Sequence, residues 1–219
     1  MNNNPTLVSV ARQAFAAGVL LLAAGTSFAA FTPQQGVNYK LLTPAQPTSA
    51  APGKVEVVEV FWYACGHCYL LEPKLEAWER SGKPAQAQLV RLPATWNATL
   101  KTHARVFYTM QLLGKQNLNP EIWREINLKG NHLDTPAAIE AFFTSHGVAK
   151  ADFQRAFASF TVDSNIMKAE DLNRRYKIAG TPTVIVNGKY VTDVGMAGSE
   201  DRLFEVINAL VAKEKTATN

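Results

Sequence analysis

The spacing of hydrophobic and polar residues changes twice between residues 55 and 92, and the changes mark three regular elements. Residues 55–63 are almost continuously apolar and rich in β-branched and aromatic side chains, a pattern typical of a strand buried on both faces of a sheet. Over residues 68–80, Leu71 and Leu75 recur at helical spacing among charged side chains, so we expect a helix there. A second apolar run at 88–92 predicts another strand. The order is therefore strand, helix, strand.

The middle of the chain shows only helical signals. Thr99 and Thr135 are residues of a type that caps helices, and Pro120 and Pro136 suit a first helical turn. The pattern predicts helices over 99–113, 119–128, 135–146, 151–160 and 162–176. None of these segments shows a familiar catalytic constellation. The isolated histidines here are expected to be surface or packing residues: His103, His132 and His146.

The last part of the chain returns to strand signals. Residues 183–186 and 189–191 are apolar and flank Asn187-Gly188, a dipeptide that tolerates the positive φ angles of a type I′ hairpin turn. Ser199 can cap a final helix whose apolar face repeats over residues 203–210. The whole pattern predicts an α/β fold in which a block of helices interrupts a sheet domain.

The N-terminus has the composition of a secretory signal peptide. A polar stretch ends near Arg12, the apolar segment 14–25 follows, and a small-x-small pattern ends at Ala29. We expect residues 1–29 to be a cleaved signal peptide, so that the mature protein is exported and soluble. Residues 30–53, whose second half is rich in Pro, Ala, Ser and Thr, are predicted to be an extended N-terminal lead-in.

The charge pattern excludes two classes of partner. The net charge of +4 becomes +3 when Arg12 is removed with the signal peptide, and cations are scattered among anions rather than grouped in blocks. This pattern favours an ordinary solvated surface over one that binds nucleic acid or an anionic membrane.

The only two cysteines, Cys65 and Cys68, lie at the junction between the predicted strand and the predicted helix. A disulfide between them closes so small a loop that it adds almost nothing to stability. We therefore expect the pair either to exchange electrons or to hold a metal. A closed zinc site takes about four ligands, and the sequence has no second cysteine pair and no spaced histidine pair to complete one.

Four short segments of the chain form a recognisable set: Glu59-Val60-Phe61, Cys65-Gly66-His67-Cys68-Tyr69, Gly180-Thr181-Pro182-Thr183 and Val186-Asn187-Gly188-Lys189-Tyr190. Together they resemble the DsbA-like periplasmic thiol:disulfide oxidases of the thioredoxin-fold family. The resemblance implies a central mixed β-sheet flanked by helices, with an inserted all-helical domain. We accordingly expect a discontinuous thioredoxin-fold domain at 54–97 and 171–213, with the helical insertion at 98–170. The resemblance implies no cofactor and no metal.

The resemblance also implies a chemistry for the cysteine pair. Cys65 is expected at the helix N-terminus, where free N–H groups and the helix dipole favour a thiolate and lower the thiol pKa. Cys68, one turn into the helix, is expected to be more buried and to act as the resolving thiol. His67 is expected to add a donor or a positive charge near the sulfur. The implied reaction is disulfide donation, in which a substrate thiolate attacks Cys65 and forms a mixed disulfide.

Two further sites are carried over from the family. Thr181-Pro182 matches the cis-proline loop that faces the disulfide and pairs with the substrate backbone. Glu59 matches an acidic residue buried beneath the cysteines. Burial is expected to raise its pKa, which suits it to take part in moving a proton from Cys68.

Partners and compartment also follow from the resemblance. We expect reduced or unfolded exported proteins as substrates and a DsbB-like, quinone-linked membrane protein as the reoxidising partner. The expected form is a monomer in the periplasm of a Gram-negative bacterium. No nucleic acid partner is expected.

Two residues depart from the best-known DsbA pattern. Gly66 stands where that pattern has proline, as it does in eukaryotic protein disulfide isomerases, and Thr181 stands where valine is usual. A periplasmic disulfide isomerase or reductase is therefore the alternative enzyme, although the segment before Lys54 is too short to supply the dimerisation domain of DsbC-like isomerases. A metal-binding module or a chaperone on the same fold is the alternative from a different class.

Overall fold

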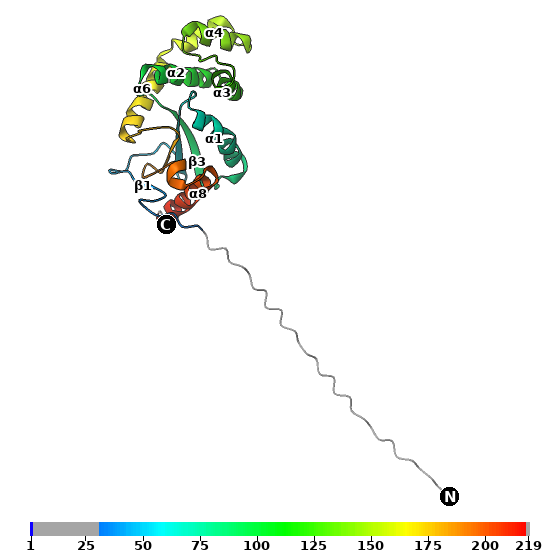
Figure 1. The fold of residues 1–219 in the computed structure, drawn as a ribbon, viewed down its shortest axis with the longest axis vertical. Coiled ribbons are helices and arrows are strands. Elements are labelled where there is room, and N and C mark those ends of the chain that lie inside the picture. Colours follow the sequence, from blue (N-terminus) through cyan, green and yellow to red (C-terminus); the bar gives the residue numbers. More distant parts are fainter. Residues whose placement is uncertain (2–30, 218–219) are drawn as a thin grey trace. The chain divides into compact units, whose positions relative to one another are not determined.

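The computed structural model describes Met1 and residues 31–217, so residues 2–29 of the predicted signal peptide lie outside the described part of the chain (Figure 1). The elements follow one another as β1 (Lys40–Leu41), β2 (Val55–Phe61), α1 (Gly66–Ala77), the π-helical turn η1 (Trp78–Gly82), β3 (Ala87–Pro93), α2 (Ala98–Leu112), the 3-10 turn η2 (Gln116–Leu118), α3 (Asn119–Asn127), α4 (Pro136–Ser145), α5 (Lys150–Phe157), α6 (Phe160–Arg175), β4 (Thr183–Val186), β5 (Tyr190–Thr192), α7 (Val194–Ala197) and α8 (Glu200–Ala217).

Within residues 31–217, five strands form one mixed sheet in the order β1-β5-β4-β2-β3. Strand β2 pairs in parallel with β3 and antiparallel with β4, so Val58 lies opposite both Val90 and Ile185. Strand β5 pairs antiparallel with β4 and with β1. Together with helices packed on both faces, this mixed sheet is the thioredoxin fold that the sequence predicts, and the prediction is confirmed.

The strand predictions hold because the sheet buries the segments that are continuously apolar. Every residue of β2 is buried, as expected for the strand between β3 and β4. At the hairpin between β4 and β5, Asn187 and Gly188 have φ angles of 51° and 63°, which are the positive values that the predicted turn requires.

Two hydrophobic cores cover the two faces of the sheet. On one face, alternate residues of β2 and β4 pack against α1 and α8. On the other face, the intervening residues of these strands pack against α6. The first core includes Val57, Leu71, Leu75, Val184, Leu203 and Val206, and the second includes Val58, Val60, Leu92, Ala169, Tyr176 and Ile185.

The helices between β3 and β4 share a third core, which reaches the end of β2. Figure 1 shows α2, α3 and α4 together at one end of the described structure, beyond the sheet. Their buried side chains include Phe107, Ile122, Trp123, Ile139, Phe142 and Phe143, and they pack in the same cluster as Phe61, Tyr63 and Cys68. The helical segment therefore forms one side of the surroundings of the cysteine pair.

Three local predictions differ from the structure. Helix α2 is capped by Asn97 rather than by Thr99 and begins at Ala98; the Asn97 Oδ1 accepts a hydrogen bond from the Leu100 N–H at 2.9 Å. Within the lead-in, Lys40 and Leu41 form an edge strand, β1, beside β5, which the sequence pattern did not predict. The short helix α7 was not expected, and Asp193 caps it. No helix in the described part of the chain is both long and apolar enough to cross a membrane.

Candidate redox-active site

The turn between β2 and α1 places Cys65 at the start of a helix. Cys65 is the N-cap of α1, with extended backbone angles, and its backbone N–H donates to the Trp62 carbonyl at 3.0 Å. The Cys65 sulfur accepts a hydrogen bond from the Cys68 backbone N–H at 3.4 Å. A side chain that accepts from the first helical turn is what an N-cap requires, and here a sulfur takes that position.

Cys65 is the sulfur that solvent can reach, since its side chain is only partly buried. Hydrogen bonding with the Cys68 side chain, with the Thr181 side chain and with the Cys68 and His67 backbone lowers the pKa of Cys65 from 9.0 to about 5, against the opposing effect of burial. The helix dipole acts in the same direction. A thiol with this pKa is ionised at neutral pH.

Cys68 has the opposite character. It is fully buried, and both its hydrogen bond to the Cys65 sulfur and its burial raise its pKa well above the ordinary value for a thiol. The two sulfurs thus share one proton unequally: the proton stays on Cys68, and the hydrogen bond that it makes stabilises the Cys65 thiolate. The sequence expectation of an accessible thiolate beside a buried thiol agrees with this geometry.

Glu59 is the buried carboxylate of β2 and is fully shielded from solvent. Burial raises its pKa to about 7, while the charge of Arg91 opposes this effect. Its Oε1 atom has no hydrogen-bond partner among the described residues. Its charge also contributes to the raised pKa of Cys68. A carboxyl group with a pKa near neutrality can either accept or release a proton at physiological pH.

Three residues that the sequence analysis did not select connect Glu59 to the helical segment. Arg91 on β3 forms ion pairs with Glu59, at 3.3 Å, and with Glu72 on α1. Asn119 donates to Glu72 at 3.0 Å and accepts from the Tyr63 hydroxyl at 2.7 Å. The signal that could have found Arg91 and Glu72 is a charged residue within an apolar strand or on a buried helix face.

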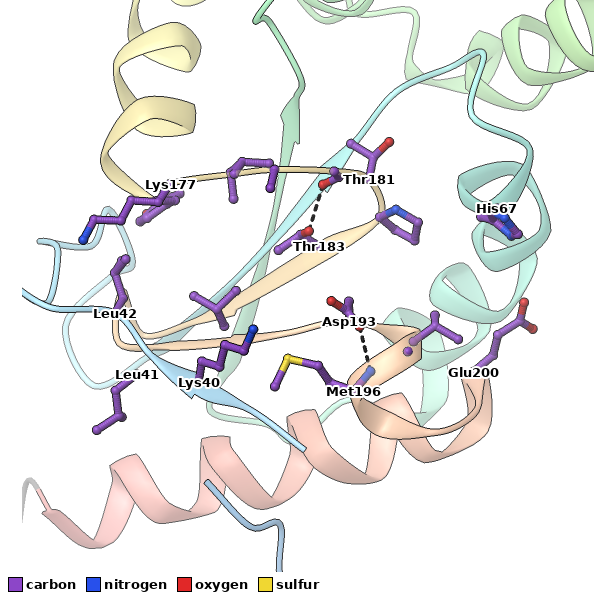
Figure 2. A pocket seen from close by; sticks show the side chains of 18 residues that line it. Lys40, Leu41, Leu42, His67, Lys177, Thr181, Thr183, Asp193, Met196 and Glu200 are labelled. Atoms are coloured by element: carbon purple, nitrogen blue, oxygen red, sulfur yellow. Dashed lines mark hydrogen bonds between the residues drawn. The ribbon is translucent and has the colours of Figure 1, made fainter. Parts of the chain in front are cut away.

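The loop before β4 brings Thr181 against the cysteine pair. The Cys65 thiol lies 3.4 Å from the Thr181 carbonyl oxygen, and the peptide bond from Thr181 to Pro182 is cis. Both residues line a cavity of about 690 Å³ together with His67 (Figure 2). His67 lies at one end of this cavity, and Lys40 and Lys177 lie toward the other. The structure therefore groups Cys65, Cys68, Thr181 and Pro182, while Glu59 lies in the sheet beneath.

The same part of the structure offers no metal site. Among the described residues, no group of three or more His, Cys, Asp or Glu side chains is arranged to hold a metal ion.

Comparisons with known proteins identify relatives that match most of the chain. Residues 84–210 match the family model described as DSBA-like thioredoxin domain. The chain is 37% identical to the thiol:disulfide interchange protein DsbA of Azotobacter vinelandii over 209 residues, which cover 93% of this chain and 96% of that protein. It is 36% identical to the protein of the same name from Pseudomonas syringae pv. tomato, covering 84% of this chain and 86% of the relative.

Solved structures show the same similarity. The crystal structure of Pseudomonas aeruginosa DsbA superposes with a TM-score of 0.79 and 34% sequence identity, over 86% of this chain and 96% of the other. The oxidoreductase NmDsbA1 from Neisseria meningitidis superposes with a TM-score of 0.74 and 26% identity, over 84% and 95% of the two chains.

Proposed function

The chain belongs to the DsbA family of thiol:disulfide oxidoreductases, and on that premise we propose that it donates a Cys65–Cys68 disulfide to other proteins through a mixed disulfide at Cys65. The observation that carries this proposal is the contrast between the two sulfurs. Cys65 is accessible and has a pKa lowered to about 5. Cys68 is buried and has a raised pKa.

In the oxidised protein, a substrate thiolate attacks the Cys65 sulfur. The bond between Cys65 and Cys68 breaks, and Cys68 leaves with the electron pair and takes up a proton. The second thiolate of the substrate then attacks the substrate sulfur of the mixed disulfide, and Cys65 leaves as a thiolate. Two electrons pass from the substrate to the cysteine pair. Stabilising the leaving thiolate favours this direction, because a lower thiol pKa stabilises the reduced form of the pair.

The remaining site residues support these steps. We assign Glu59 to proton exchange with Cys68, because its pKa is raised to about 7 and its charge acts on that sulfur. Thr181 and Pro182 lie beside Cys65 at the edge of the cavity, where the substrate segment next to the reacting sulfur would bind. His67 is exposed on the first turn of α1, where it can provide a donor or a positive charge to the mixed disulfide.

The proposal extends to compartment, partners and domain organisation. We place the mature protein in the periplasm as a monomer, with reduced exported proteins as substrates and a DsbB-like membrane protein as the oxidant that restores the disulfide. Residues 98–170 are proposed to form a helical domain inserted between 54–97 and 171–213. The core shared by α2, α3 and α4 supports that division.

The test combines two cysteine variants with a thiol titration. Cys65→Ser is expected to abolish disulfide transfer to a reduced, unfolded model protein. Cys68→Ala, incubated with the disulfide-bonded form of that protein, is expected to accumulate a mixed disulfide: Cys65 attacks the substrate disulfide, the second substrate sulfur leaves as a thiol, and no Cys68 is present to release the substrate. Titration of the Cys65 thiolate by its ultraviolet absorbance should give a midpoint near pH 5, as its lowered pKa requires. A midpoint near 9, together with a pair that stays reduced in exported material, would instead identify a reductase or isomerase.

A further inference from the structure

His103 connects the helical segment to the turn that holds the cysteines. It lies on α2 and is 2% exposed. Its Nδ1 atom is 2.8 Å from the indole Nε1 of Trp62, and its Nε2 atom is 2.8 Å from the carbonyl oxygen of His132. One imidazole ring therefore joins α2, the loop before α4 and the residue that follows β2.

The two partners of the ring determine its protonation state. The indole N–H of Trp62 can only donate, so His103 Nδ1 must be a bare acceptor. The carbonyl of His132 can only accept, so His103 Nε2 must hold the proton. Both hydrogen bonds exist only in the neutral Nε2–H tautomer. A proton added at Nδ1 would place two N–H donors, that of His103 and that of the Trp62 indole, opposite each other and break the hydrogen bond between them.

The backbone of Trp62 contacts both sulfur-bearing residues. Its carbonyl accepts the Cys65 N–H at 3.0 Å, which closes the turn leading into α1. A backbone hydrogen bond from Trp62 to Cys68 lowers the pKa of that thiol, against its burial. A shift of Trp62 would therefore change the position of the Cys65 N-cap and the polarity around Cys68 together.

We infer that neutral His103 is a positioning residue of the thiol:disulfide reaction, which holds Trp62 so that the Trp62 backbone maintains the geometry of Cys65 and Cys68. The inference rests on the proposed function for its kinetic consequence, but the hydrogen bond itself can be tested without any substrate. Acidification should release the contact once His103 accepts a proton.

The groups that face His103 determine when that protonation occurs. Burial lowers the pKa of His103, while the His132 carbonyl and the charge of Asp134 oppose this effect, and the His132 side chain adds to it. The rings of Trp62 and Tyr63 lie 6.1 and 6.4 Å from its ring. His103 therefore stays neutral through the physiological range and becomes protonated only at acidic pH.

Two substitutions separate the two hydrogen bonds of the ring. His103→Asn places an amide oxygen where Nδ1 lies and keeps an acceptor for Trp62. His103→Gln extends its amide toward the position of Nε2, keeping a donor for His132 but no acceptor for Trp62. Trp62→Phe removes the donor from the other side. His146→Gln, in a helix-terminal histidine that bonds to Phe142, is the matched control.

The measurements are the rate of disulfide transfer and the Cys65 thiolate titration from pH 3 to 8. We expect His103→Gln and Trp62→Phe each to slow transfer about 3- to 10-fold, the effect of losing one hydrogen bond, and to raise the midpoint of the Cys65 titration. We expect His103→Asn to stay within about twofold of the wild type by the same reasoning, and the double variant His103→Gln with Trp62→Phe to be no slower than either single variant.

Three outcomes would overturn the inference: equal defects in His103→Asn and His103→Gln, a normal Trp62→Phe variant, or a double variant whose defect is the product of the two single ones. If a variant does not fold, the indole proton of Trp62 in the wild-type protein is followed by NMR as the pH falls. Its exchange protection should be lost as His103 protonates, and protection that persists in the folded protein at acidic pH contradicts the inference. A wild type that transfers no disulfide would overturn the proposed function but leave this NMR test intact.

Discussion

Two buried glutamates, Glu59 and Glu214, lie near opposite ends of the sheet, and they differ in their hydrogen-bond partners and in the direction of their pKa shifts. Glu59 lies in β2 beneath the cysteine turn, with one carboxylate oxygen unpartnered among the described residues and a pKa raised to about 7 by burial. Glu214 lies on α8 near the hairpin at the far end of β4. It accepts hydrogen bonds from the Tyr190 hydroxyl at 2.7 Å, from Lys189 Nζ at 2.7 Å and from Asn187.

The two carboxyl groups differ in the number of hydrogen-bond donors around them as well as in their depth of burial. Burial acts to raise the pKa of Glu214 as well, yet the hydrogen bonds from Lys189, Tyr190 and Asn187 leave that pKa lowered. Glu59 shares one arginine with a second carboxylate, Glu72. A carboxylate that is fully paired fastens α8 to the hairpin, whereas one that is underpaired remains able to exchange a proton with its surroundings.

Among the substitutions that test this contrast, removing Arg91 should have the largest effect on the free energy of unfolding. Arg91→Met leaves Glu59 and Glu72 buried without their shared cation, so we expect a loss of about 3 kcal/mol in the free energy of unfolding at pH 8. The loss should shrink toward pH 5, because both carboxyl groups can then be protonated. Urea unfolding at the two pH values measures it. Lys101→Met, which breaks an exposed ion pair with Glu170, is the control and should change stability by less than about 0.5 kcal/mol. Equal losses for Arg91→Met at both pH values would contradict the interpretation.

Glu214→Gln should have a smaller effect, which also fades as the pH falls but does so at lower pH. The folded state lowers the pKa of Glu214, so its stabilising contribution is present above the ordinary glutamate pKa and is lost as the pH falls through the lowered one. We expect destabilisation of about 2 kcal/mol at pH 7, from weakened charge-assisted hydrogen bonds, and little effect near pH 3. Disulfide transfer should be unchanged. If Glu214→Gln had the stability of the wild type but transferred disulfides slowly, Glu214 would take part in the reaction rather than in stability, and the distinction from Glu59 would fail.

Glu59→Gln should have the smallest effect and should stabilise the protein. The folded state raises the pKa of Glu59 from 4.5 to about 7, so the wild type loses stability as the pH rises through this interval, and glutamine removes that loss. We expect a gain of about 1 kcal/mol at pH 8 and none at pH 4. The gain is smaller than the pKa shift alone implies, because Arg91 then keeps only one carboxylate partner. Thermal unfolding across pH measures this gain. If Glu59→Gln instead destabilised the protein at pH 8, the Glu59 carboxylate would be stabilised by its partners to the same extent as that of Glu214.

Local sequence patterns were sufficient for most of the fold. Strand β2, the hairpin at Asn187 and the helix after Ser199 follow from runs of a few residues, because burial and turn geometry act over that distance. Strand β1 was missed because it is two residues long and exists only through its pairing with β5. The N-cap of α2 was displaced by two residues, since Asn97 and Thr99 are both plausible caps in the sequence.

The site was predictable where it lies within one segment and unpredictable where it depends on distant partners. Cys65 and Cys68 follow from their junction between a strand and a helix. Asn119 could not be selected, because it is uncharged and its carboxylate partner Glu72 lies on another element. His103 appeared isolated for the same reason, since its partners Trp62 and His132 are 41 and 29 residues away in the sequence.

The pairing of β2 with β4 has a consequence for the order in which the molecule is made. Val58 pairs with Ile185, so a chain under synthesis contains both thiols long before it contains the strand that completes the sheet beside them. Contacts between such distant segments form late in folding. Until then the start of α1 is not held on a finished sheet and Thr181 is not beside Cys65. A partly made chain therefore lacks the contribution of Thr181 to the lowered pKa of Cys65, and only the finished protein has the full lowering of that pKa.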